Sequence, residues 1–224
     1  MTTLINPSFE DGWTDIQSGP ASLNQQPNGW ELRWLEPGEL LWDSNDEARG
    51  VPECRHLNTI HLPPNEQPGA PDALILDGEW TYKIFHAGSS FGARLKQTVT
   101  GLRPGSNVRV VAPIQVHRHK DNDPWAVEAG VWINEYGGWH SYLGNREWRQ
   151  MELVGQADEN GEAKVVIRVK SKWDKPKDFF IDAITFQGIP AELPPPPPPE
   201  PEPERTPVYI VTLYDDGTGE WEDV

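Results

Sequence analysis

The sequence predicts an all-β domain built as a sandwich of two antiparallel sheets. Three segments, residues 108–117, 127–134 and 163–170, alternate apolar and polar residues with the period of two that marks a half-buried strand. Turn signals separate these runs, and no clear helical period appears within residues 1–187. Several such strands in one domain are typical of two sheets packed face to face.

The alternation also assigns the two faces of each strand. In the first segment the even-numbered residues from 108 to 116 are apolar, so Gln115 and His117 are expected to point from the opposite face. In the second segment Val131 and Ile133 are expected to take the core face, which turns Glu128 and Trp132 outward. Turns are predicted at residues 103–105, 136–138 and 159–161.

Regions outside these strands differ in composition. Residues 14–72 are irregular and rich in Pro and Gly, which predicts a loop-rich insertion that is functional or packed by its own aromatic side chains. Residues 190–205 are a Pro/Glu-rich linker with polyproline II character. Residues 206–224 resume a strand pattern around Asp216-Gly217, which predicts a small β hairpin. The domain organisation is therefore a sandwich at 1–189, a linker at 190–205 and a hairpin at 206–224.

A lone hairpin is only marginally stable in water. We therefore expect residues 206–224 to dock on their own sandwich, on a neighbouring copy of the chain or on a protein partner.

Two short motifs near the ends of the first 190 residues each carry one acid. Residues 6–12 contain Glu10, residues 179–186 contain Asp182, and both motifs are predicted to form strands. Because the first and last strands of a sandwich often lie close together, these two carboxylates are expected to meet over one cation. Carboxylates combined with backbone carbonyls suit calcium. The alternative is that Glu10 caps a turn and Asp182 faces water.

Three motifs, taken in order, resemble those of non-catalytic carbohydrate-binding modules of the galactose-binding-like type. They are Asn6-Pro7-Ser8-Phe9-Glu10-Asp11-Gly12, Gln97-Thr98-Val99-Thr100-Gly101-Leu102-Arg103-Pro104-Gly105 and Phe179-Phe180-Ile181-Asp182-Ala183-Ile184-Thr185-Phe186. The resemblance covers roughly residues 4–187. It implies a jelly-roll β-sandwich, a structural Ca²⁺ ion held far from the sugar, and the binding of a glycan or polysaccharide.

The candidate carbohydrate-binding residues are Gln115, His117, Glu128 and Trp132. If their two strands are neighbours, a flat indole sits beside several hydrogen-bonding groups, which is the combination that sugar binding needs. The alternative is that a loop covers Trp132 and that water solvates the polar groups. Three further loop tryptophans are candidates for the rim of such a site: Trp125, Trp139 and Trp173.

Composition narrows the classes of partner. The chain has 19 Lys and Arg against 35 Asp and Glu, a formal net charge of −16, which repels nucleic acid and anionic lipid and also favours solubility. We therefore expect neither a nucleic-acid nor a membrane partner. No nucleophile-elbow, zinc-protease or phosphate-loop motif appears, so the chain is not expected to be an enzyme. The single cysteine, Cys54, allows no intrachain disulfide.

Two functions of different classes fit these observations. The first is a non-catalytic carbohydrate-binding module with a structural calcium ion. The alternative is a structural or attachment protein of a phage particle or surface assembly, with the sandwich as scaffold and the hairpin as docking element. Residues 1–5 lack the basic and apolar regions of a signal peptide. The expected location is extracellular or virion-associated.

Overall fold

The computed structural model describes residues 2–20, 22–191, 209–213, 217 and 219–223. The chain divides into two units, Met1–Ala191 and Glu192–Val224. Of the expected linker at 190–205, the part from residue 192 onward lies outside the described residues. Among the residues that the structure covers, no helix is long and apolar enough to cross a membrane.

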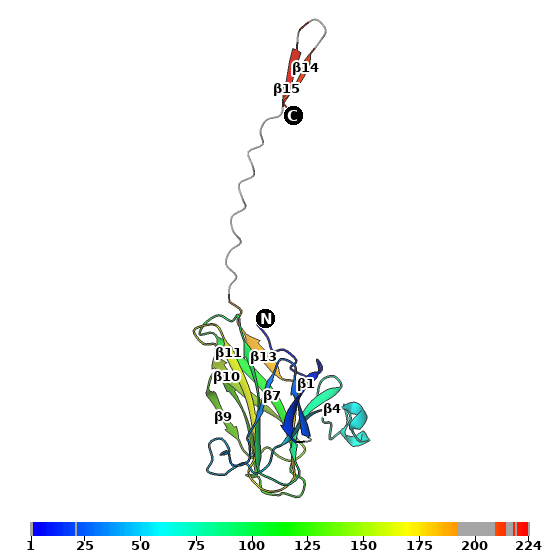
Figure 1. Cartoon of the computed structure of the whole chain (residues 1–224), viewed down its shortest axis with the longest axis vertical. Helices are drawn as coiled ribbons and strands as arrows, with labels where there is room; N and C mark the ends of the chain where they lie inside the picture. Colours follow the sequence, from blue (N-terminus) through cyan, green and yellow to red (C-terminus); the bar gives the residue numbers. More distant parts are fainter. Residues whose placement is uncertain (1, 21, 192–208, 214–216, 218, 224) are drawn as a thin grey trace. The chain divides into compact units, whose positions relative to one another are not determined.

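The first unit contains two large antiparallel sheets (Figure 1). The six-stranded sheet has the order β10-β7-β12-β5-β4, and β13 also pairs with β7. Its strands are β4 (Glu53–Asn58), β5 (Trp80–His86), β7 (Asn107–His117), β10 (Trp148–Gln156), β12 (Lys177–Ile181) and β13 (Thr185–Gly188).

The five-stranded sheet has the order β3-β6-β11-β8-β9. Its strands are β3 (Glu31–Trp34), β6 (Phe91–Val99), β8 (Val127–Ile133), β9 (Tyr136–His140) and β11 (Ala163–Ser171). A separate hairpin pairs β1 (Trp13–Gly19) with β2 (Ser22–Pro27), and two short 3₁₀ turns, η1 (Thr59–His61) and η2 (Pro64–Glu66), follow β4. These sheets confirm the predicted jelly-roll β-sandwich.

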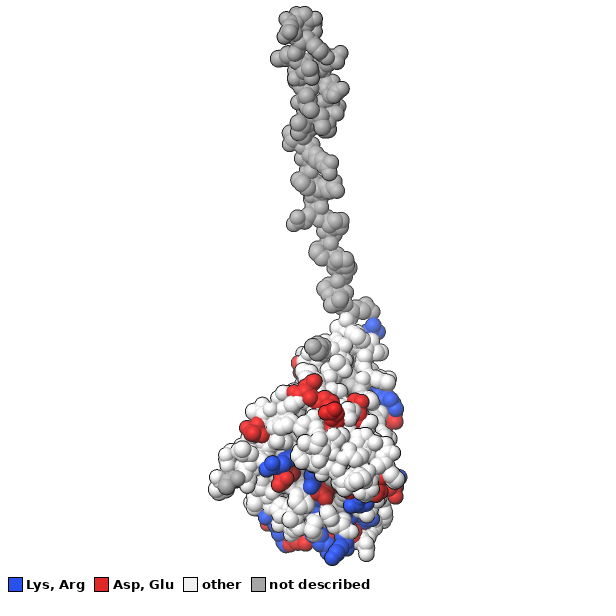
Figure 2. Space-filling model, turned by 90° about the vertical axis from the view of Figure 1, so that its right-hand side faces the viewer, with Lys and Arg blue, Asp and Glu red and all other residues white. Residues whose placement is uncertain are grey.

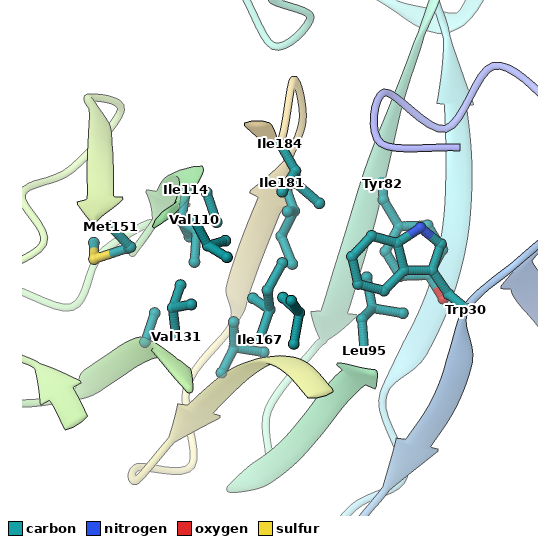
Figure 3. Close-up of a cluster of buried hydrophobic side chains, with 14 of the residues drawn as sticks. Trp30, Tyr82, Leu95, Val110, Ile114, Val131, Met151, Ile167, Ile181 and Ile184 are labelled. Carbon is teal, nitrogen blue, oxygen red and sulfur yellow. The ribbon is translucent and has the colours of Figure 1, made fainter. Parts of the chain in front are cut away.

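The core lies between the two sheets (Figure 3). The even-numbered residues of β7 from Val108 to Val116 all belong to it, and so do Val131 and Ile133 of β8. The parity read from the sequence is therefore confirmed for these strands, because one register fixes which face every side chain takes.

Three local predictions were wrong. The motif at 6–12 forms turns, because Asn6 (φ 51°) and Phe9 (φ 61°) are left-handed and the Asn6 carboxamide bonds Asp11 N–H at 2.9 Å. The motif at 179–186 is interrupted after Ile181, where Ala183 has a φ of 50°. The turn expected at 136–138 lies instead at Asn134 and Glu135, so β9 begins at Tyr136.

The insertion at 14–72 is more regular than its composition predicts, since it contains β1 to β4. The end of the insertion and the residues that follow it, up to Ile75, pack on the outer face of the six-stranded sheet. Leu62, Leu74 and Ile75 form a small apolar cluster there with Phe180 of β12.

The described residues of the second unit form a two-stranded antiparallel sheet. Its strands are β14 (Tyr209–Leu213) and β15 (Gly219–Asp223), with Tyr209 opposite Asp223 and Leu213 opposite Gly219.

Candidate functional site

Five connections meet at one end of the sandwich, which we call the loop end. They are residues 42–49, 87–90, 118–126, 141–147 and 172–176. Backbone hydrogen bonds tie them together, including Lys172 N–H to Ala126 C=O at 2.9 Å and Arg49 N–H to Ser90 C=O at 2.8 Å. The loop end lies opposite the end that carries the N-terminus (Figure 1). Acidic and basic side chains are intermingled near it on the face seen in Figure 2, without a field of one sign.

Three exposed aromatic side chains gather at the loop end. Trp173 is 39% exposed, Trp125 is 49% exposed and Tyr142 is 56% exposed. The rings of Trp125 and Tyr142 meet edge to face, with centroids 4.4 Å apart. Exposed indole and phenol rings offer flat apolar faces while their polar atoms stay hydrated.

One carboxylate positions both indole-bearing residues. Trp173 Nε1–H donates to Asp123 Oδ2 at 3.1 Å, and the backbone N–H of Trp125 donates to Asp123 Oδ1 at 2.9 Å. Because these residues come from two different loops, Asp123 links the Trp173 indole to the backbone of the 118–126 loop.

Trp173 also borders a polar hollow of about 330 Å³. Arg49 and Asp174 form an ion pair of 2.7 Å across part of this hollow, and Asp174 Oδ1 accepts the Ser90 N–H at 3.2 Å. Lys172 lines the hollow as well. An aromatic wall beside convergent donors and acceptors is the usual composition of a small-ligand site.

Buried ion pairs connect the loops of the loop end to the strands of the sandwich. Asp121 and Lys177 are joined at 2.8 Å, with both side chains 1% exposed or less. Burial acts to raise the pKa of Asp121, but hydrogen bonds from Lys177 and from Asp123 N–H outweigh it and hold that pKa below its ordinary value. Removing one partner of such a pair leaves an uncompensated buried charge, so this pair fixes the 118–126 loop on β12.

Glu128, a predicted sugar ligand, belongs to this supporting network. Its carboxylate contacts Lys170 and Lys172 at 3.0 Å each and accepts the Ser141 hydroxyl at 2.9 Å. Burial acts to raise the pKa of Glu128, but the bonds from these three side chains hold it below its ordinary value. Glu128 therefore anchors β8, β11 and the 141–147 loop to one another.

Trp132 points outward as the parity predicted, but it is 6% exposed, so the expectation of an exposed platform was wrong. The Trp139 ring packs edge to face on it at 4.9 Å, and the Arg168 guanidinium lies 4.5 Å from its ring centre. Gly137 also lies so close that a Cβ there would come within 2.6 Å of the indole. The β8–β9 hairpin thus covers Trp132.

Gln115 and His117 lie in the other sheet, on β7, so the four candidate residues do not form one platform. Both side chains are buried, and His117 Nε2 lies 2.8 Å from Gln115 Oε1. Gln115 Nε2 donates to Ala73 C=O at 3.3 Å, and Trp148 Nε1 donates to the same oxygen at 2.8 Å. The segment around Ala73, directly after the insertion, therefore covers this face. Burial, assisted by the nearby Arg146 charge, lowers the pKa of His117 to about 4.

Glu10 and Asp182 both hold the segment before β5. Asp182 Oδ2 accepts the N–H of Leu76 at 2.6 Å and of Asp77 at 3.2 Å, and Glu10 Oε1 accepts the N–H of Glu79 at 3.0 Å and of Trp80 at 2.8 Å. Asp182 is fully buried, and this burial raises the pKa of its carboxyl to about 7. Among the described residues, no three His, Cys, Asp or Glu side chains are grouped closely enough to hold a metal.

Gly78 lies between these two anchor points. Its φ is +75°, and a Cβ there would come within 2.3 Å of Glu10 Oε1. The close approach of Glu10 to this segment therefore requires glycine.

The signals for the loop end were partly visible in the sequence. Trp125 and Trp173 were rim candidates, and the structure brings them together around Asp123, whereas Trp139 lies on the outer face of the five-stranded sheet against Trp132. Tyr142, Arg49 and Asp174 were missed. Their positions depend on which loops meet at one end, and no local sequence pattern carries that information.

Comparison with known proteins gives a fold and no more. No family model and no curated protein matches the chain. A family 61 carbohydrate-binding module solved with β-1,4-galactotriose is similar at 16% identity and a TM-score of 0.51, over 84% of this chain and 99% of that one. The chain has the fold of a carbohydrate-binding module.

Two other similar structures have TM-scores below 0.5 and carry no argument about function. A family 16 carbohydrate-binding module matches at 13% identity and a TM-score of 0.42, over 82% of this chain and 98% of that one. The enzymatically active domain of tailspike protein 4 from bacteriophage CBA120 matches at 13% identity and a TM-score of 0.44, over 72% of this chain and 20% of that one.

Proposed function

We propose that the first unit binds glycans at the loop end without cleaving them. The observation that carries this proposal is the position of Trp173, whose half-exposed indole is oriented by Asp123 and borders the polar hollow. A sugar ring presents C–H faces that stack on an indole, while its hydroxyls need planar donors and acceptors such as Arg49 and Asp174. Both signs of charge line the hollow, which favours a neutral, hydroxyl-rich ligand.

The test is a glycan array probed with the full chain, followed by calorimetry on the glycans that bind. β-1,4-Galacto-oligosaccharides belong among the probes, since the module solved with galactotriose shares this fold. Trp173→Ala should weaken binding by about 1–3 kcal/mol, or about 5- to 150-fold. Ile60→Ala, at a residue 82% exposed outside the loop end, is the control and should leave the affinity unchanged. Unchanged affinity in Trp173→Ala would contradict the proposal, as would shortening of the bound glycan.

We further propose that a structural calcium ion binds at Glu10 and Asp182. Asp182 is a fully buried carboxylate, and none of the described Lys or Arg side chains forms an ion pair with it. A cation would offset that buried charge, and calcium accepts carboxylate and backbone carbonyl oxygens together. Such an ion would fasten the turns at 6–12 to the segment before β5 and would take no part in sugar binding.

A second candidate function concerns the C-terminal unit. β14 and β15 form a two-stranded sheet in a unit of their own, and a sheet of that size is only marginally stable alone. We propose that it docks on a protein partner or a neighbouring copy by adding to a sheet edge. A structural or attachment protein of a phage particle or surface assembly, extracellular or virion-associated, would use the chain in this way.

A further inference from the structure

A second hollow, of about 490 Å³, lies at the end of the sandwich opposite the loop end. It is bounded by Tyr136 at the start of β9, by Val154 to Gln156 at the end of β10, and by Asn107 at the start of β7. We call it the Tyr136 groove. None of its seven lining residues is charged, although 24% of the chain is.

Apolar and amide groups are both accessible in the Tyr136 groove. Tyr136 is 66% exposed and Val154 is 50% exposed, and both line the groove. The side chains of Asn107 and Gln156 are exposed beside them, and neither amide bonds another described group of the protein. Gly155 contributes no side chain, and Ile133 packs against it, because a Cβ at Gly155 would come within 3.0 Å of Ile133 Cβ.

The turn that carries Tyr136 is held rigidly. Asn134 Nδ2 donates to Gln156 C=O at 3.0 Å and to Glu162 C=O at 3.1 Å, and Asn134 Oδ1 accepts the Lys164 N–H at 2.8 Å. Asn134 (φ 47°) and Glu135 (φ 70°) take the left-handed pair of conformations of a tight hairpin turn. The backbone that carries the phenol ring is therefore fixed before any ligand arrives, which lowers the entropy lost on binding.

We propose that the Tyr136 groove is a second binding site, independent of the loop end, for a neutral sugar residue. The Tyr136 ring stacks on the C–H face of the sugar, and the free amides of Asn107 and Gln156 bond its hydroxyls. The uncharged lining offers no partner for a carboxylate or sulfate, and the net charge of −16 repels anionic glycans. The ligand class is therefore a neutral polysaccharide.

The two sites are too far apart for one short oligosaccharide. They lie at opposite ends of β7, whose eleven residues span about 35 Å at about 3.3 Å per residue. A long polysaccharide, or two chains, can occupy both sites, so avidity raises the apparent affinity for polymers over short oligosaccharides.

The experiment uses the full chain and an array of neutral polysaccharides that includes galactan, xylan and mannan. Trp173→Ala should retain binding to at least one of them, and adding Tyr136→Ala should reduce that remaining binding at least about tenfold. Tyr136→Phe in the same background should preserve it, because stacking needs the ring. A melting temperature within a few degrees of the parent separates lost binding from lost folding.

The outcomes separate the two proposals. If Trp173→Ala abolishes all binding, or if Tyr136→Ala leaves the remaining binding unchanged, the groove proposal is overturned. If Trp173→Ala changes nothing while Tyr136→Ala abolishes all binding, the groove proposal stands and the loop-end proposal fails.

Discussion

The carboxylate of Asp123 joins Trp173 to the backbone of Trp125, with hydrogen bonds of 3.1 and 2.9 Å. A single acid in the 118–126 loop thus orients the Trp173 ring and holds the backbone at Trp125. Ligand stacking depends on ring direction, so Asp123 is a positioning residue even if no sugar touches it.

Asp123→Ala should weaken glycan binding by about 3- to 10-fold, because the Trp173 indole and the Trp125 backbone each lose a hydrogen bond. Its effect on the free energy of unfolding should stay below about 1 kcal/mol, since the bonds are exposed. Asp123→Asn, which keeps one of the two acceptor oxygens, is the matched comparison and should recover part of the affinity. Calorimetry and urea titration measure the two quantities, and equal affinities for Asp123→Ala and the parent would contradict this role.

Trp132→Ala should destabilise the domain by about 3–5 kcal/mol, because a buried indole packed on Trp139 and Arg168 would leave a cavity. Trp125→Ala removes a half-exposed indole and should cost under about 1 kcal/mol. Urea unfolding midpoints compare the two variants. If they shift equally, Trp132 is not a packing residue.

His56 should make the protein sensitive to acid. Burial lowers its pKa to about 4 from an ordinary 6.5, and neither ring nitrogen has a hydrogen-bond partner among the described residues. As the pH falls from about 6.5 to 4, His56 binds a proton in the unfolded chain but stays neutral in the folded chain. Stability is therefore lost over that range, by about 3 kcal/mol in total.

His56→Leu should flatten this dependence, measured as the unfolding free energy at pH 7 and pH 4.5. His117, whose pKa is also lowered to about 4, acts with the same sign, so part of the acid sensitivity should remain. The exposed His61→Leu is the control and should retain the parent slope. An unaltered slope in His56→Leu would show that His56 is not the origin.

Calcium should raise the melting temperature if Glu10 and Asp182 hold it, because a ligand of the native state stabilises by mass action. Chelator should lower the melting temperature of the parent, and Asp182→Ala should remove that response. Scanning calorimetry with and without chelator provides the measurement. If chelator leaves the melting temperature of the parent protein unchanged, the calcium proposal is wrong.

Deletion of residues 206–224 should abolish assembly or partner binding while leaving the melting of the first unit and its chelator response unchanged. Analytical ultracentrifugation of the full chain and of the deleted chain tests assembly directly. Identical sedimentation, with no loss of partner binding, would exclude a docking role for this segment.

The sequence predicted the sheets well where one face is apolar, as in β7, β8 and β11, because period-two alternation records burial directly. It also placed Trp132 on the correct face. It failed on exposure and adjacency: the cover over Trp132 comes from β9, and the cover over Gln115 comes from Ala73, far away in the chain. Those contacts depend on strand order, which alternation does not encode.

For Glu10 and Asp182, too, the sequence predicted only part of what the structure shows. The sequence predicted that Glu10 and Asp182 meet over one cation. In the structure both accept backbone N–H groups of residues 76–80, and neither lies in a regular strand. Left-handed residues at Asn6, Phe9 and Ala183 shape these turns. None of the three is a glycine, so the sequence gives no sign of the left-handed conformation.

Both ends of the first unit lie beside Gly101: a Cβ there would lie 3.7 Å from Thr2, and the Ala191 N–H bonds the Gly101 carbonyl at 2.9 Å. A pull between a glycan held at the loop end and the exit at Ala191 would therefore run along the strands and load many ladder hydrogen bonds at once in shear. A pull between the two termini would instead peel the chain from one corner, a few bonds at a time. The first unit should thus resist a force applied between the loop end and Ala191, and it should unfold at a lower force when pulled between its two termini.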